Sequence, residues 1–199
     1  MHASYPRVAH HDRPHNLRDH RSYNFPQIIM NWRDEIDKSW TLFLDRDGVI
    51  NVRLIDDYVK NINEFEFLPG VLEAFKIFSE KFGRIIIVTN QQGVGKGIMT
   101  MQDVEKVHAY MMKEIENQHG RVDAIYVCPQ LKTDPDNFRK PSPRMAFMAQ
   151  HDFPEIDFEK SIMIGDSSSD IEFGKNAGMY TILIGGEFES LIEFTSTIK

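Results

Sequence analysis

The chain has 199 residues, of which 41% are hydrophobic and 27% charged, a balance typical of a folded domain with an apolar core. Its formal net charge of −7 argues against nucleic-acid binding through a basic surface. The single cysteine, Cys128, excludes an internal disulfide and fits a reducing compartment. No apolar run is long enough to span a bilayer, and the N-terminus lacks the apolar segment of a signal peptide. We therefore expect a cytoplasmic protein without nucleic-acid or membrane partners.

Residues 1–29 differ in composition from the rest of the chain. They contain five of the eight histidines and show neither helical nor strand periodicity. The irregular histidine spacing disfavours a metal-binding tract, so we interpret this segment as a flexible leader. The compact domain is expected to span residues 30–199, beginning at Met30.

From residue 40 onward, short apolar runs alternate with amphipathic segments. The runs are short and mostly β-branched, which favours strands. Pro69-Gly70 and Ser142-Pro143 predict helix starts, and Thr100 can cap a helix over residues 101–118. Buried strands that alternate with helices predict an α/β fold, a three-layer Rossmann-like parallel sheet with helices on both faces. The predicted strands cover residues 41–44, 85–88, 122–127, 161–164 and 180–184.

Polar residues follow the strands at the points where ligands bind in such sheets. Carboxylates, a hydroxyl and a lysine would gather at one edge of the sheet. Each has a simpler explanation by itself, since Asp and Thr commonly form turns or cap helices. Four such features in order, each after a buried strand, favour a common chemical purpose. They are Asp45 and Asp47, Thr89, Lys140, and Asp166 with Asp170.

The residue types at this edge predict phosphoryl chemistry. Two carboxylates as close as Asp45 and Asp47 repel each other unless a cation or proton offsets their charge, and a few oxygen ligands suit Mg²⁺. An ionised Asp45 can attack phosphorus to form an aspartyl-phosphate. Asp47 can protonate the leaving oxygen and later deprotonate water. Thr89 and Lys140 can bind the phosphoryl oxygens.

With these motifs the sequence resembles the haloacid dehalogenase (HAD) superfamily of phosphatases, over about residues 41–185. The resemblance implies Asp45 as nucleophile, Asp47 as general acid and base, and Thr89 and Lys140 as further catalytic groups. The four motifs read Asp45-Arg46-Asp47-Gly48-Val49-Ile50, Thr89-Asn90-Gln91, Lys140-Pro141 and Gly165-Asp166-Ser167-Ser168-Ser169-Asp170.

The resemblance also implies a magnesium site. Its ligands would be the Asp45 carboxylate, the backbone carbonyl of Asp47 and the Asp166 carboxylate. Asp170 would support these ligands from outside the coordination sphere.

Within the superfamily, the sequence is similar to the branch of D-glycero-D-manno-heptose 1,7-bisphosphate phosphatases and histidinol-phosphate phosphatases. Asn51 and the Gly95-Lys96-Gly97 stretch favour the heptose enzymes, which implies removal of a C7 phosphate. Histidinol phosphate remains an alternative substrate. A polynucleotide 3′-phosphatase is disfavoured by the acidic charge, and a non-catalytic binding protein by the intact motifs. The branch motifs here are 47–51, 58–59, 65–71, 89–97 and 139–141.

The resemblance breaks at the zinc loop of this branch, where a Cys-x-His is followed by a Cys-x-Cys. The corresponding segments here are Cys128-Pro129-Gln130 and Asp136-Asn137-Phe138. A single thiolate cannot form a tetrahedral zinc site, so we expect no structural zinc. Prolines and local packing would then hold the loop.

The short spacing between motifs leaves no room for a cap domain. Selectivity would therefore come from three loops, at 48–66, 91–99 and 128–140. Lys96 and Arg139 are candidates for a second phosphate. Asn90 and Asn51 are further substrate-binding candidates, although Asn51 could instead stabilise the turn of the first loop. We expect a monomer, and we expect the helical residues His108 and His119 to be exposed.

Overall fold

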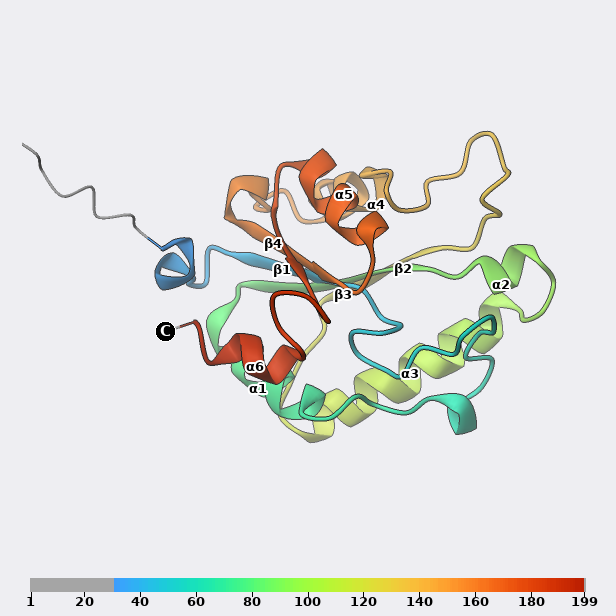
Figure 1. Cartoon of the computed structure of the whole chain (residues 1–199), viewed down its shortest axis with the longest axis horizontal. Coiled ribbons are helices and arrows are strands. Elements are labelled where there is room, and N and C mark those ends of the chain that lie inside the picture. Colours follow the sequence, from blue (N-terminus) through green and yellow to red (C-terminus); the bar gives the residue numbers. More distant parts are fainter. Residues whose placement is uncertain (1–30, 199) are drawn as a thin grey trace, which may run out of the picture. The chain divides into compact units, whose positions relative to one another are not determined.

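The computed structural model of the chain describes residues 31–198, and the predicted leader lies outside this range. Five parallel strands form one sheet in the order β3-β2-β1-β4-β5 (Figure 1). The predicted α/β class with a parallel sheet is confirmed. The strands are β1 (Thr41–Leu44), β2 (Arg84–Asn90), β3 (Ala124–Cys128), β4 (Ser161–Gly165) and β5 (Tyr180–Leu183).

Helices cover both faces of the sheet. In Figure 1, α4 and α5 lie on one face, and α1, α3 and α6 lie on the other. The helices are α1 (Val71–Lys81), α2 (Gln92–Gly95), α3 (Met101–Asn117), α4 (Arg144–Asp152), α5 (Ser168–Ala177) and α6 (Leu191–Thr195), with short 3₁₀ turns at Trp32–Glu35, Ile62–Glu64 and Phe158–Lys160.

Alternate residues of each strand point to opposite faces, which divides the apolar core in two. Leu42 and Leu44 of β1 pack with the cluster that contains α1, α3 and α6. Phe43 packs with the cluster that contains α4 and α5. All three side chains are fully buried, which explains why this strand reads as a continuous apolar run.

Capping boxes form at the starts of two helices. Thr100 caps α3, which begins at Met101 as predicted, and Asp103 completes a capping box with it. Ser167 and Asp170 form another at the start of α5. Strand β3 begins at Ala124, two residues later than predicted, because the Asp123 carboxylate accepts the backbone N–H of Ile85 at 2.7 Å.

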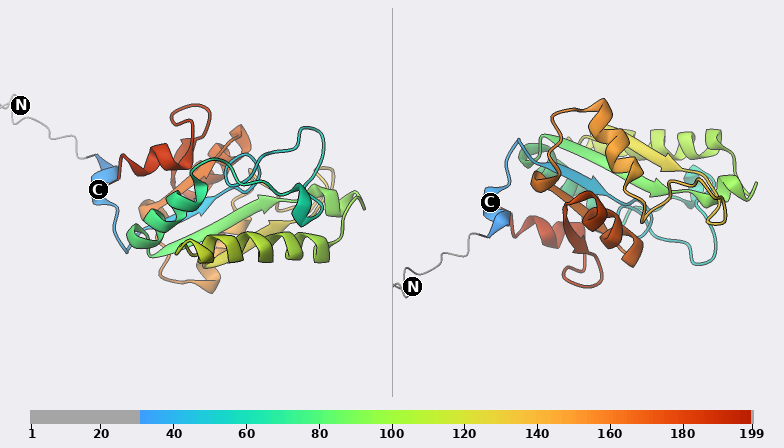
Figure 2. Two further views of the ribbon diagram at one scale, coloured as in Figure 1. Left: turned by 90° about the horizontal axis from the view of Figure 1, so that it is seen from below. Right: turned by 90° about the horizontal axis from the view of Figure 1, so that it is seen from above.

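The strands all point toward one end of the sheet, where the loops after β1, β2 and β3 meet (Figure 2). Across residues 31–198, no inserted domain covers this end. A short helix, α2, forms within the segment 91–99, which we predicted to be a loop. Between residues 31 and 198 there is also no helix with the length and hydrophobicity needed to cross a membrane.

Candidate active site

The first strand delivers Asp45 to the centre of the sheet edge. Leu44 pairs with Ile87 of β2 and Ile164 of β4, so residues that follow these three strands are neighbours. The Asp45 N–H donates to the Ile164 carbonyl at 2.9 Å, which fixes the backbone at the end of β1. The register of the sheet therefore brings the residues at the strand ends together, as the sequence predicted.

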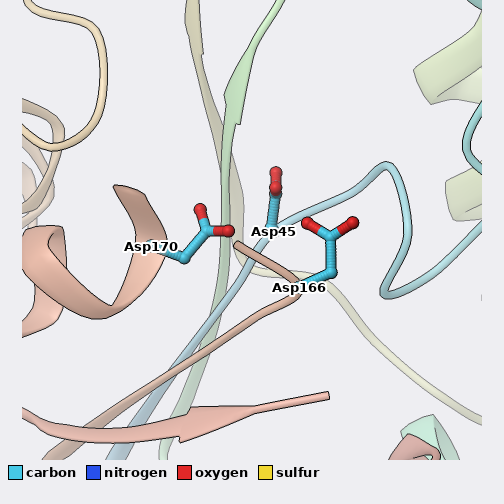
Figure 3. A group of neighbouring side chains, drawn as sticks. All are labelled: Asp45, Asp166 and Asp170. Atoms are coloured by element: carbon cyan, nitrogen blue, oxygen red, sulfur yellow. The ribbon is translucent and has the colours of Figure 1, made fainter. Parts of the chain in front are cut away.

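Three carboxylates converge at this edge. Asp45, Asp166 and Asp170 each offer an oxygen within 4.8 Å of the others, and their side chains turn toward one another in Figure 3. Gly48 permits this approach, because a Cβ at that position would lie 2.0 Å from the Asp166 Oδ2. Its φ of 89° also favours glycine.

Lys140 offsets part of this negative charge from a fully buried position. Its Nζ lies 2.8 Å from Asp45 Oδ1 and 2.6 Å from Asp170 Oδ1, and donates to the Val88 carbonyl at 2.9 Å. Burial lowers the pKa of Lys140, but the charges of Asp45 and Asp170 outweigh burial and raise it overall. Burial raises the pKa of Asp45 to about 7, against the opposing charge of Lys140.

The acidic cluster fits a magnesium ion. Asp166 Oδ1 is buried and has no hydrogen-bond partner among residues 31–198, while Oδ2 accepts from Arg53 Nη1 at 3.0 Å. Burial raises the pKa of Asp166, with Arg53 opposing the shift. An unpaired buried carboxylate oxygen beside Asp45 is the hard donor that Mg²⁺ prefers. Asp170 is already engaged, by Lys140 and by the N–H and hydroxyl of Ser167.

Asp47 faces a different set of partners. Arg46 donates to its carboxylate through Nη2 at 2.9 Å to each oxygen, and through Nε at 3.3 Å. Asn51 and Gln91 donate through their side-chain amides at 3.0 and 2.8 Å. Burial raises the pKa of Asp47, but Arg46 and the two amides outweigh burial and lower it overall. These partners therefore favour the carboxylate form of Asp47 over the protonated form.

Arg46 is fully buried, and its Nη1 lies 3.1 Å from Nε2 of His108. Our prediction that His108 is exposed is wrong, because its exposed fraction is 6%. The burial of His108 could have been predicted, because its position shares one helix face with positions 104, 111 and 115. All four residues are buried. His119, beyond the end of α3, is exposed as predicted.

Three other predicted site residues make hydrogen bonds within the fold, and one of them, Asn90, also lines the cavity described below. Thr89 is buried, and its hydroxyl accepts from Gln91 at 2.9 Å. The Asn90 side-chain oxygen, Oδ1, accepts the backbone N–H of Lys140 at 3.0 Å. Asn51 is fully buried and donates to Asp47, which favours the second of its two interpretations, a residue that stabilises the first loop.

A cavity of about 320 Å³ opens beside these groups. The three loops that were expected to supply selectivity all contribute to its wall, together with Asp45, Asp47 and Lys140. Cationic side chains from each loop reach it: Arg53, Lys96 and Arg139. Nη1 of Arg139 is buried without a hydrogen-bond partner in the described part of the chain, which leaves a donor for an anionic group.

The 128–140 loop is held by hydrogen bonds to its own residues. The Gln130 side-chain oxygen accepts the N–H of Phe138 at 3.1 Å. Asp134 accepts the N–H of Leu131 at 2.9 Å, and Asn137 donates to the Asp134 carbonyl at 2.6 Å. Cys128 is buried at the end of β3. The expectation of no structural zinc stays a prediction.

Comparisons with known proteins agree with this site. A family model described as HAD-hydrolase-like matches residues 137–191. The D-glycero-alpha-D-manno-heptose-1,7-bisphosphate 7-phosphatase of Mycobacterium bovis is 36% identical over 80% of this chain and 91% of its own length. The corresponding protein of Campylobacter jejuni is 39% identical over 81% and 91%. This chain belongs to the heptose-1,7-bisphosphate 7-phosphatase family of HAD-like hydrolases.

Solved structures of this family share the fold. The D,D-heptose 1,7-bisphosphate phosphatase of B. bronchiseptica, complexed with magnesium and phosphate, has a TM-score of 0.72 and 26% identity. The match covers 79% of this chain and 96% of that chain. The family that the sequence motifs predicted is therefore confirmed, and with it the class of enzyme, a HAD-type phosphatase.

Several residues of this family member's site were not predicted. Arg46 and Gln91 lie inside the predicted motifs, but their contacts with Asp47 depend on side-chain direction, which a motif does not specify. Arg53 lies in the first loop, where no periodic pattern identifies a contact. His108 could have been found from its place on the buried face of α3.

Proposed function

We propose that this chain is a magnesium-dependent phosphatase that removes the C7 phosphate of D-glycero-D-manno-heptose 1,7-bisphosphate. The proposal is supported above all by a nucleophilic carboxylate and an acidic cation site that open into a cavity lined by four cationic side chains, Arg53, Lys96, Arg139 and Lys140. A sugar with two phosphates matches that charge distribution. Relatives 36–39% identical to this chain carry the same activity in their names.

In the first step, the Asp45 carboxylate attacks phosphorus and the bond between phosphorus and the C7 oxygen breaks. This step needs Asp47 in its protonated form, and the proton is the one that Asp47 takes from water in the second step of the preceding turnover. Asp47 donates it to the departing oxygen, which leaves as the sugar hydroxyl. Lys140 lies 2.8 Å from Asp45 and would orient it while offsetting charge on the phosphoryl oxygens. Thr89 would contribute its hydroxyl to the same group after a change in its bond with Gln91.

In the second step, Asp47 takes a proton from water, the water oxygen attacks phosphorus, and the bond to Asp45 breaks to release phosphate. The carboxylate form of Asp47, favoured by Arg46, is the form this step needs. Asp45, Asp166 and the Asp47 backbone carbonyl would hold Mg²⁺, with Asp170 in support. When bound, the ion neutralises negative charge that the carboxylates and the phosphate bring together.

The second phosphate would bind Lys96 and Arg139. Lys96 Nζ lies 5.3 Å from the Tyr58 ring centre, at the cavity wall. This contact is made with an aromatic ring and involves no carboxylate. Arg139 offers the unpaired Nη1. Since sugar bisphosphates do not cross membranes unaided, the enzyme would act in the cytoplasm where they form. A monomeric state stays a prediction.

The test is phosphate release with Mg²⁺ from both anomers of the heptose bisphosphate, histidinol phosphate and a 3′-phosphorylated oligonucleotide. We expect preference for one heptose anomer, and no turnover by Asp45→Asn. Preference for histidinol phosphate would keep the mechanism and reject the substrate. Equal rates for Asp45→Asn and the parent on every substrate would reject the mechanism.

A further inference from the structure

His108 is a buried titratable residue with no part in the chemistry above. It comes from the middle of α3, far along the chain from the site, and its exposed fraction is 6%. Its Nε2 lies 3.1 Å from Nη1 of Arg46, which is itself fully buried. A buried imidazole against a buried guanidinium needs an explanation, because both are normally hydrated cations or polar groups.

The contact determines the protonation state of the imidazole. A guanidinium has five N–H donors and no acceptor, so Nε2 of His108 must accept and the ring proton must lie on Nδ1. Burial, followed by the charge of Arg46, lowers the pKa of His108 to about 3. The imidazole is therefore a neutral acceptor for Arg46 near neutral pH.

The bond to His108 constrains the rest of the guanidinium. Because the group is planar and rigid, fixing Nη1 also fixes the directions of Nε and Nη2. Those two nitrogens make all three contacts of Arg46 with Asp47, at 2.9 to 3.3 Å. The Asp47 side chain is 26% exposed, at the cavity, so the orientation of its carboxylate depends on its hydrogen-bond partners.

We propose that His108 is a positioning residue, which fixes the Arg46 guanidinium and thereby aims the Asp47 carboxylate at the leaving oxygen of the substrate. The proposal rests on the proposed function of Asp47 as general acid and base. Asn51 and Gln91 also hold Asp47, so loss of the His108 contact should misplace the carboxylate only in part.

Substrates with different leaving groups can distinguish a misplaced Asp47 carboxylate from a generally distorted active site. An alkoxide leaves poorly and needs a proton from Asp47, whereas 4-nitrophenolate is a stable anion and leaves without one. The kcat/KM value reports the reaction only up to release of the leaving group. Misaimed Asp47 should therefore lower kcat/KM for an alkyl phosphate more than for 4-nitrophenyl phosphate, while a distorted or partly unfolded site should lower both equally.

The experiment measures kcat/KM with Mg²⁺ on 4-nitrophenyl phosphate and on the alkyl phosphate that the parent enzyme hydrolyses best. His108→Leu removes the acceptor at similar volume, with His108→Met as a second such variant if the first does not fold. His108→Gln can still accept from Arg46 through its side-chain oxygen. Met111→Leu, on the same buried face of α3, is the matched control for packing.

We expect His108→Leu to lose about tenfold or more on the alkyl phosphate, a part of the 10²–10⁴-fold usual for acid–base catalysis, and less than about threefold on the aryl phosphate. His108→Gln should recover most of the alkyl activity, and Met111→Leu should behave as the parent. The proposal is overturned by equal losses on both esters, by no loss, or by a glutamine variant as impaired as leucine.

The outcomes also separate this proposal from the proposed function. A parent enzyme that prefers histidinol phosphate rejects the heptose substrate, and the ester comparison still decides the role of His108. A parent enzyme inactive on every phosphate ester rejects both, because Asp47 then has no leaving group to protonate.

Discussion

Asp45 lies half-buried beside two other carboxylates, and its pKa of about 7 connects metal binding to pH. Below this pH the metal-free site holds a proton that Mg²⁺ must displace, whereas above it the carboxylate is already ionised. The Kd for Mg²⁺ should therefore rise about tenfold per pH unit below 7 and level off above it. Calorimetry at pH 6 and 8, in buffers of different ionisation enthalpy, measures both the affinity and the proton released.

Asp45→Asn is the control for this dependence, because the amide has no proton to release. Its residual Mg²⁺ binding should lose the step near pH 7. Equal affinity of the parent at pH 6 and 8 would contradict the assignment of the proton to Asp45.

Arg53 pairs with Asp166 and would compete with a cation bound there. Its Nη1 lies 3.0 Å from Asp166 Oδ2, and the arginine side chain is 59% exposed, so the pair is weak but occupies a predicted metal ligand. Arg53→Ala should tighten Mg²⁺ binding in the absence of substrate by about two- to fivefold, the range expected for an exposed ion pair. Calorimetric titration measures the change.

Arg84→Ala removes a comparable surface arginine, paired with Glu155 at the start of β2, and should leave Mg²⁺ affinity unchanged. Weaker binding in Arg53→Ala than in the parent would mean that the arginine helps to orient Asp166 instead of competing for it.

At the scale of elements, Arg139 and Lys140 lie at the end of the 128–140 loop and line the cavity. Hydrogen bonds within the loop stabilise its conformation. Gln130→Leu removes the acceptor for the Phe138 N–H, one of these bonds. Loss of one hydrogen bond should raise KM for the bisphosphate about two- to tenfold, because Arg139 becomes less ordered. Steady-state kinetics measure the change.

Gln130→Glu keeps an acceptor oxygen at the same position and serves as the matched control. It should retain the parent KM. If the leucine and glutamate variants are equally impaired, the side-chain amide must have a different role from the bond to Phe138.

The elements were predictable where one local signal determined them. The capping box at Thr100 set the start of α3, and the apolar run 41–44 set β1. The start of β3 was not predictable, because it depends on the Asp123 side chain reaching Ile85 on a neighbouring strand. The same holds for the site. Asp45 and Asp166 follow their strands directly, whereas Arg46 and His108 meet across 62 residues of sequence.

At the scale of the whole molecule, burial of neutral His108 makes folding depend on pH. Its pKa is about 3 in the folded protein and about 6.5 when unfolded, so between these values the unfolded state binds more protons. The free energy of unfolding should therefore fall as pH falls through this window, by up to about 1.4 kcal/mol per unit from this residue. Urea unfolding at pH 6 and 4.5 measures the slope.

His108→Gln lacks the titrating group and should show a smaller fall in the free energy of unfolding between these pH values. The carboxylates contribute equally to both proteins and cancel in the difference. Parallel slopes for the parent and His108→Gln would show that the imidazole is already protonated in the fold.

The Lys140 ammonium joins oxygen atoms from the ends of β1 and β2 and from the start of α5. Without it, two buried carboxylates would face each other with no cation between them, a cost of several kcal/mol in proteins. Selection for a folded chain would thus retain this lysine in a descendant that had lost all activity. Lys96 and Arg53 are exposed and are under no such constraint. In distant homologues, a change of substrate should therefore appear as substitutions at these two exposed cations while the buried lysine is retained.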